Sequence, residues 1–174
     1  MEKNLLYIFT IILCIIASKG YAQRVTENTL TASTKDSEYI DLGLTSGTKW
    51  KNANEHQDKN GFLDYYFDYD GAMVQFGKNM PTKEQWMELI NECSWQWNGL
   101  GYNVTGPNGE SIILPAAGLC LPSSYNPENV SKYGYYWSSM SDGSCCAWRL
   151  IHKKSKVYMS RGNRISKLSV RLVR

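Results

Sequence analysis

The chain lacks the sequence patterns that mark the common classes of hydrolase and metalloenzyme. It has only two histidines, His56 and His152, no Gly-x-Ser-x-Gly and no metal-binding histidine spacing. Nucleophilic catalysis needs a nucleophile, a base and an orienting group. His152 falls on an expected strand, where we expect a surface or rim residue rather than a base. The sequence therefore predicts no catalytic residues, no bound metal and no cofactor.

The chain also lacks coiled-coil heptads, low-complexity stretches and an apolar run long enough to span a bilayer. Its one apolar run, Leu5 to Ala17, has thirteen residues, whereas a spanning helix needs about 20. Small residues at Gly20 and Ala22 then suit a signal peptidase. We therefore predict a cleaved signal peptide over residues 1–22 and an extracytoplasmic protein (secreted, periplasmic or at the cell surface), with no membrane insertion after cleavage. Residues 23–37 are polar and aperiodic, which predicts a flexible leader into one domain over residues 38–174.

Cysteine is scarce, and four cysteines remain after the predicted cleavage: Cys93, Cys120, Cys145 and Cys146. An even count in an oxidising compartment suggests disulfides, and four cysteines allow three pairings. A direct bond between Cys145 and Cys146 would close a strained ring. We therefore favour a bridge from Cys120 to one of these two.

Acidic residues are absent after Asp142, where the charged side chains are all basic. One interpretation is a surface for anionic partners such as nucleic acid or acidic glycans. The other is an intramolecular match to the acidic segment of Asp64, Asp68 and Asp70. The formal net charge is only +3, which favours the match and a protein that does not bind nucleic acid. The basic residues concerned are Arg149, Lys153, Lys154, Lys156, Arg161, Arg164, Lys167, Arg171 and Arg174.

Several local elements have clear signals. Thr82 and Gln85 form a capping box, and Trp86, Leu89, Ile90 and Cys93 then follow helical spacing. This pattern predicts a helix that starts after Met80-Pro81, ends near Cys93 and buries its apolar stripe in the core. The sequence also predicts a first strand and its return (38–44 and 49–50), a hairpin (101–105 with 111–114) and long irregular loops (52–70 and 115–133). The acidic run Asp68-Tyr69-Asp70-Gly71 is only a fragment of a calcium loop.

The last forty residues alternate between apolar and polar positions. Trp148, Leu150 and His152 fall on one side of an expected strand, with Ala147, Arg149 and Ile151 on the other. A lysine-rich turn, 153–156, leads to a partner strand over 157–160, and the alternation returns from Leu168 to Leu172. This pattern predicts a terminal antiparallel sheet with one solvent-exposed face.

Six segments of the chain together carry a family resemblance: 39–50, 80–86, 104–109, 114–118, 135–139 and 169–171. They resemble segments of the bacterial secreted FISUMP-type (major paralogous domain) proteins. Together with strands at both ends and one helix between them, the resemblance implies an α+β protein with a C-type lectin-like fold, mainly antiparallel sheet with one well-marked helix and long irregular loops.

That family is similar to lectin-like domains diversified by retroelements and, more remotely, to formylglycine-generating enzymes. The resemblance implies a secreted or cell-surface binding role, displayed from the terminal sheet and its loops. Family members often carry a cysteine near Ala53 as the partner of the one at Cys93. Its absence here implies that Cys93 is unpaired.

The leading hypothesis is a non-catalytic recognition module for a glycan or a surface protein. Exposed Trp, Tyr and Arg dominate binding surfaces. The candidate ligand-binding residues are Trp148, Arg149, Tyr158, Arg161 and Asn163, unless Trp148 is a core residue. Binding is expected to need no metal, because the carboxylate triplets of calcium-dependent lectins are missing.

Two alternatives remain. One is a metal- or thiol-dependent enzyme of the formylglycine-generating type, which would hold copper with Cys145 and Cys146. Adjacent side chains diverge in a strand, so both cannot serve without a bulge. The other is a hypervariable target of a retroelement.

Overall fold

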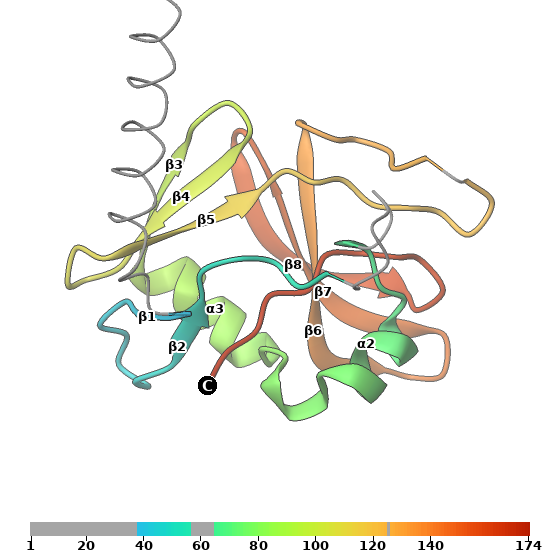
Figure 1. The fold of residues 1–174 in the computed structure, drawn as a ribbon, viewed down its shortest axis with the longest axis horizontal. Helices are drawn as coiled ribbons and strands as arrows, with labels where there is room; N and C mark the ends of the chain where they lie inside the picture. The colour runs from blue at the N-terminus through green and yellow to red at the C-terminus, as the bar shows by residue number, and fades with distance from the viewer. Residues whose placement is uncertain (1–37, 57–64, 125) are drawn as a thin grey trace, which may run out of the picture. The chain divides into compact units, whose positions relative to one another are not determined.

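The computed structural model describes residues 38–56, 65–124 and 126–174 (Figure 1). The predicted signal peptide and leader therefore lie outside the described residues, as does Asp64. In the described part, no helix has the length and apolar character needed to cross a membrane. The elements are β1 (Tyr39–Asp41), β2 (Lys49–Lys51), α2 (Tyr69–Gln75), η2 (Gly77–Asn79), α3 (Lys83–Glu92), β3 (Ser94–Trp97), β4 (Gly101–Thr105), β5 (Ser111–Pro115), β6 (Tyr133–Asp142), β7 (Cys146–Lys153) and β8 (Lys156–Asn163).

The strands form three antiparallel sheets, ordered β1-β2, β3-β4-β5 and β6-β7-β8 (Figure 1). The protein is therefore α+β and mainly antiparallel, as the sequence predicts. The expected first strand with its return and the expected hairpin are β1-β2 and β4-β5, and the lysine-rich turn joins β7 to β8. Strand β3, with Trp95 and Trp97, was not predicted.

Helix α3 begins and ends where its sequence predicts. The Thr82 hydroxyl accepts from the Gln85 backbone amide at 3.2 Å, and the Gln85 side chain accepts from the Thr82 amide at 2.9 Å. Trp86 and Leu89 are fully buried, and the Trp86 indole donates to the carbonyl of Trp137 in β6. The apolar stripe of α3 thus faces the core, as expected.

Replacing Thr82 with alanine is expected to lower the free energy of unfolding by about 1 kcal/mol, because one amide at the helix start loses its acceptor. Urea unfolding monitored by circular dichroism measures the change. Thr82→Ser keeps the hydroxyl and serves as the control. Its free energy of unfolding should fall by at most half as much as that of Thr82→Ala. An equal loss in both variants would contradict a role for the cap.

A second helix, α2, was not predicted. Asp68 caps its first turn by accepting from the Gly71 amide at 2.8 Å, and only Tyr69 and Ala72 are buried. With seven residues, the helix is too short to show a helical period in the sequence. The fragment that resembles a calcium loop is therefore a helix cap, and Asp70 pairs with Arg164.

The prediction of one solvent-exposed face on the terminal sheet is wrong. Both faces of β6-β7-β8 carry fully buried side chains, such as Leu150 on one face and Ala147 on the other. Two core clusters cover them: one includes Trp86 and Tyr102, and the other includes Phe67. Alternation shows which residues share a face of a strand, but it does not show what packs on that face.

His152 is likewise not a rim residue, since its exposed fraction is 0%. Its ring lies among those of Trp97, Tyr102 and Tyr136, with centroid distances of 6.3, 5.4 and 5.8 Å. A Cβ at Gly134 would lie 2.0 Å from His152 Nε2, so only glycine fits on the neighbouring strand. Burial lowers the pKa of His152 to about 4, against a smaller opposing contribution from the Pro115 carbonyl.

The expected last strand is instead an extended segment buried on all sides. Every residue from Leu168 to Val173 is buried, including Ser169 and Arg171. The segment forms isolated bridges with several elements, among them a parallel bridge from Ser169 to Tyr136 in β6 and an antiparallel bridge from Val173 to Trp50 in β2. It ends beside β2, where Arg174 exchanges two backbone hydrogen bonds with Lys49 (Figure 1).

The four predicted mature-chain cysteines are free thiols in the structure. The expected bridge from Cys120 to Cys145 or Cys146 is not formed, because Cys120 is buried whereas Cys145 is exposed on the turn between β6 and β7. Cys93 is the C-cap of α3, and its thiol is half-buried.

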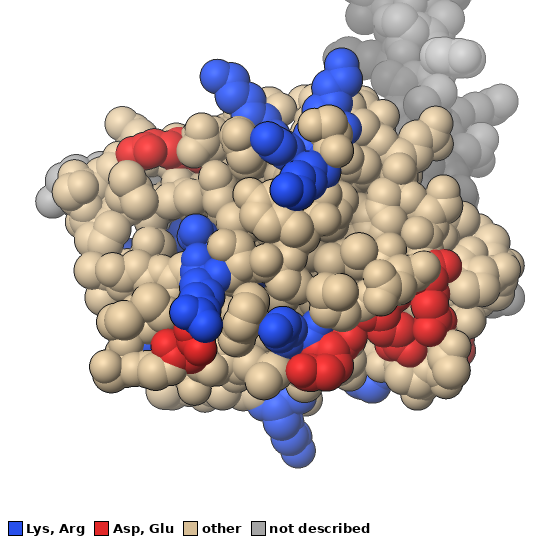
Figure 2. Space-filling view, turned by 180° about the vertical axis from the view of Figure 1, so that it is seen from behind, with Lys and Arg blue, Asp and Glu red and all other residues tan. Residues whose placement is uncertain are grey.

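Lysine and arginine side chains gather in separate groups, some of them beside acidic side chains (Figure 2). Arg164 pairs with Asp70, which confirms part of the expected intramolecular match, and Arg161 Nε lies 2.7 Å from Asp142 Oδ2. Arg171 is buried. The lysines of the β7-β8 turn (Lys153, Lys154 and Lys156) form no ion pair with any residue that the structure describes.

Candidate functional site

The five candidate binding residues do not share one surface. In the β7-β8 register, Trp148 pairs with Arg161, whereas Arg149 pairs with Ser160 and Ile151 with Tyr158. Because paired residues share a face and neighbours along a strand alternate, Trp148, Arg161 and Asn163 lie on one face of the sheet, and Arg149 and Tyr158 on the other.

Neither group offers an open platform for a ligand. The Lys83 ammonium from α3 lies 3.6 Å from the centroid of the Trp148 ring, and the Arg161 guanidinium lies 5.7 Å from it. These two cations occupy the ring that a sugar would stack on. On the other face, Arg149 lies 5.3 Å from the Tyr135 ring, and burial lowers its pKa.

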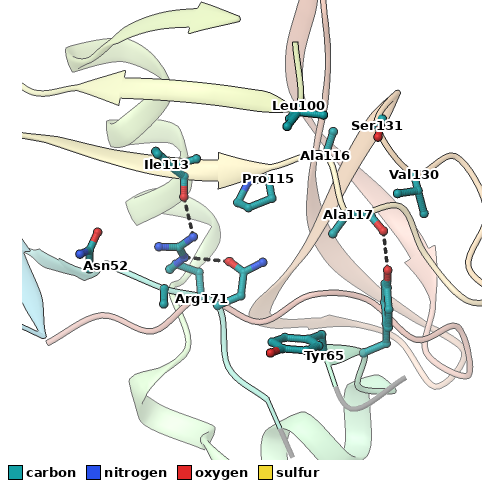
Figure 3. A pocket seen from close by; sticks show the side chains of 13 residues that line it. Asn52, Tyr65, Leu100, Ile113, Pro115, Ala116, Ala117, Val130, Ser131 and Arg171 are labelled. Carbon is teal, nitrogen blue, oxygen red and sulfur yellow. Dashed lines mark hydrogen bonds between the residues drawn. The ribbon is translucent and has the colours of Figure 1, made fainter. Parts of the chain in front are cut away.

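A groove of about 500 Å³ lies elsewhere, beside β5 and the last segment of the chain (Figure 3). This volume falls in the range of about 300–1,000 Å³ that is usual for ligand sites. None of the five candidate residues lines it, and neither do Cys145 and Cys146. Its lining comes from six stretches of the chain: Asn52–Asn54, Tyr65–Tyr66, Leu100, Ile113 with Pro115–Ala117, Val130–Ser131 and Arg171.

Arg171 holds one end of this groove together (Figure 3). Its Nε donates to Asn54 Oδ1 at 3.0 Å, one terminal nitrogen donates to the Lys51 carbonyl at 2.7 Å, and the other donates to the Ile113 carbonyl at 2.6 Å. The side chain therefore ties the last segment to the end of β2, to the loop after it and to the outer edge of β5. Burial lowers its pKa, and the nearby Tyr136 hydroxyl partly opposes this shift.

Hydrogen bonds fix the remaining walls. The Tyr66 hydroxyl donates to the Ala117 carbonyl at 2.5 Å, and the Tyr136 hydroxyl donates to the Pro115 carbonyl at 2.7 Å. The Ala116 backbone amide donates to the Leu100 carbonyl, with an N···O distance of 2.7 Å. This hydrogen bond holds the β3-β4 turn over the groove. Burial raises the pKa of Tyr66 to about 12, so this hydroxyl stays protonated at neutral pH. The walls are thus built before any ligand binds.

The rim of the groove exposes large apolar side chains. Nine such residues are exposed in the described part of the chain, and four of them line this groove. The exposed fractions are 70% for Leu100, 52% for Ile113, 48% for Tyr65 and 42% for Val130. Scattered exposed apolar residues are ordinary, but a contiguous group around a hollow marks an interaction site.

The backbone on either side of Val130 is held in a costly conformation. Asn129 and Ser131 both have a φ of 61°, in the left-handed region that residues other than glycine seldom adopt. The Ser131 backbone amide donates to the Ala116 carbonyl, with an N···O distance of 2.7 Å. This hydrogen bond stabilises the backbone conformation that places Val130 at the rim. Such strain gathers at ligand sites.

The side chains that line the groove are apolar groups and a few kinds of neutral or cationic polar group. Its side chains include no carboxylate, imidazole or thiol, and its polar groups are amides, hydroxyls and one guanidinium. In the described part of the chain, no group of three or more His, Cys, Asp or Glu residues is placed to hold a metal ion. The arrangement suits apolar contact with a few hydrogen bonds.

Sequence reasoning missed this groove because its lining comes from segments far apart in the chain. The available signals were weak: isolated apolar residues in polar surroundings, namely Leu100 after Asn98-Gly99 and Val130 after Asn129. Each is unremarkable alone.

Residues 83–173, from α3 through β8 to the buried last segment, match the family described as "Domain of unknown function (DUF8237)". The chain belongs to this family. The DUF8237 match includes Leu100, Ile113, Val130 and Arg171 but not the groove residues from β2 to Tyr66. No curated protein and no solved structure matches the chain.

Proposed function

We propose that this protein is a non-catalytic recognition module, secreted or held at the cell surface, that binds a segment of another surface protein in the groove beside β5. The single observation that carries the proposal is the group of exposed apolar side chains that line one preformed hollow: Tyr65, Leu100, Ile113 and Val130. The C-type lectin-like fold of FISUMP-type proteins, which serves binding roles, is part of this proposal, and so are the export and the absence of a nucleic-acid partner.

The rim favours a protein ligand over a glycan. Sugars bind chiefly on aromatic rings with dense hydrogen bonding, whereas three of the four rim residues are aliphatic. Exposed apolar patches mark sites of interaction with other proteins. The ligand cannot extend the sheet along this part of β5, because the Ile113 and Pro115 carbonyls already accept from Arg171 and Tyr136. The ligand is therefore expected to bind by inserting apolar side chains.

Placing a charge on the rim should weaken binding without disturbing the fold. We expect a displayed library of random peptides to yield sequences with apolar anchors when selected on the purified protein. The best synthetic peptide should bind Leu100→Lys at least about tenfold more weakly, a loss of roughly 1.4 kcal/mol. Fluorescence anisotropy with the labelled peptide measures this loss.

Val74→Lys is the matched control, because Val74 is 90% exposed on α2 and does not line the groove. It should bind the peptide as the unmodified protein does, and both variants should keep the same unfolding midpoint. Equal binding by Leu100→Lys and the unmodified protein would exclude the groove. If the protein binds a glycan array and Leu100→Lys does not, the groove is the binding site but its ligand is a glycan and not a protein.

A further inference from the structure

The turn between β6 and β7 brings two adjacent thiols into contact, and this pair is independent of the groove and of the proposed function. The Sγ atoms of Cys145 and Cys146 lie 3.1 Å apart. Cys145 is exposed and Cys146 is half-buried at the start of β7. In an ideal strand the two side chains would diverge, but Cys145 belongs to the turn, which allows them to meet.

The other two described thiols are sequestered. Cys120 is 3% exposed, and its backbone exchanges two hydrogen bonds with Lys167. Burial raises the pKa of Cys93 to about 11, and the neighbouring Glu92 and Glu88 add to the shift. Because the thiolate is the reactive form, thiol chemistry at neutral pH is concentrated at Cys145 and Cys146.

The surroundings of the pair favour attack by Cys145 first. Arg164 donates its amide to the Cys145 carbonyl at 3.0 Å, and its side chain reaches the Gly143 carbonyl at 3.4 Å, which brings a cation to the turn. Cys145 is the exposed member of the pair, so a disulfide oxidant reaches its sulfur first. The sulfur–sulfur hydrogen bond is the largest cause that raises the pKa of Cys146, so Cys146 holds its proton beside its neighbour.

A bond between these sulfurs would be strained and therefore easy to reduce. Adjacent Cα atoms are about 3.8 Å apart, whereas the Cα atoms of ordinary disulfides are about 4.4–6.8 Å apart. Strained, exposed disulfides are the labile ones. The turn has room to adjust, since Gly143 has a φ of 78° and no atom lies within 4 Å of where its Cβ would be.

We propose that Cys145 and Cys146 form a reversible vicinal disulfide by thiol exchange with a disulfide oxidant such as oxidised glutathione. The Cys145 thiolate attacks the oxidant, so a mixed disulfide forms and one glutathione thiolate leaves. The Cys146 sulfur then loses its proton and attacks the Cys145 sulfur, which releases the second glutathione. The two cysteines lose two protons and two electrons in total, and the electrons reduce the oxidant to two thiols.

Peptide mapping of the purified full chain tests this proposal. Trypsin releases Tyr133–Arg149, which contains Cys145 and Cys146 and no other cysteine. After exposure to oxidised glutathione and alkylation, this peptide should be lighter than its reduced form by two hydrogen atoms and carry no alkyl group. A modest excess of reduced glutathione should restore two alkylation sites.

Single variants separate ring closure from simple thiol reactivity. Cys145→Ser and Cys146→Ser each leave one thiol, which should keep glutathione as a stable adduct, whereas Cys120→Ser should form the ring as the unmodified protein does. An unchanged unfolding midpoint shows that each variant is folded. A stable glutathione adduct on the unmodified peptide, a link between two chains or an unreacted pair would overturn the proposal.

Discussion

Replacing Arg171 with methionine is expected to lower the free energy of unfolding by about 3 kcal/mol. The guanidinium donates to the Lys51 and Ile113 carbonyls and to the Asn54 side chain, and all three acceptors would lose their donor. A hydrogen bond to a charged group contributes about 1.5–3 kcal/mol, and these three bonds are part-buried. Removal of a desolvated charge offsets part of the sum. Guanidinium chloride unfolding measures the change.

Two further variants define the cause. Arg161→Met removes an arginine whose side chain is 66% exposed and pairs with Asp142, so the loss should stay below about 1 kcal/mol. Arg171→Lys keeps the charge but cannot donate to all three acceptors in the geometry of the guanidinium. The stability of this variant should therefore lie between those of Arg171→Met and the unmodified protein. If Arg171→Met unfolds at the same denaturant concentration as the unmodified protein, the hydrogen bonds of Arg171 do not stabilise the fold.

Acidification from pH 6.5 to pH 4 should cost about 3 kcal/mol of stability through His152 alone. Burial lowers the pKa of His152 to about 4, whereas an unfolded histidine titrates near its ordinary value of 6.5. Above pH 6.5 the ring is neutral in both states, and its contribution is constant. Between pH 6.5 and pH 4 only the unfolded chain binds the proton, so stability falls by about 1.4 kcal/mol per pH unit. Below pH 4 both states are protonated and the loss levels off.

Urea unfolding at a series of pH values from 4 to 8 checks this dependence. His152→Leu keeps a buried side chain of similar size in contact with Trp97, Tyr102 and Tyr136 but cannot titrate. The difference in stability between the two proteins should therefore change by about 3 kcal/mol between pH 4 and pH 7. If the stabilities of the two proteins instead change with pH in parallel, His152 binds its proton equally well in the folded and the unfolded chain, and its pKa is not lowered by burial.

The two large effects come from polar residues that the sequence placed at a surface. Arg171 alternates with Val170 and Leu172, so it reads as the solvent side of a strand, and His152 was expected at a surface or rim. Each is buried because a second layer covers that side: β5 and the loop after β2 around Arg171, and an aromatic group around His152. The candidate binding residues were divided between two faces because paired residues on β7 and β8 share a face and neighbours along a strand alternate.

Interactions between residues close in the chain were readable from the sequence alone. The Thr82–Gln85 capping box, the hairpin of β4 and β5, the turn between β7 and β8 and the α+β class all depend on contacts within a few residues or on strict alternation. Tertiary structure decided which faces are covered and where a groove opens, because these depend on segments more than a hundred residues apart, such as Asn54 and Arg171. A local pattern specifies the direction in which a side chain points, and only the packed neighbours determine what it meets there.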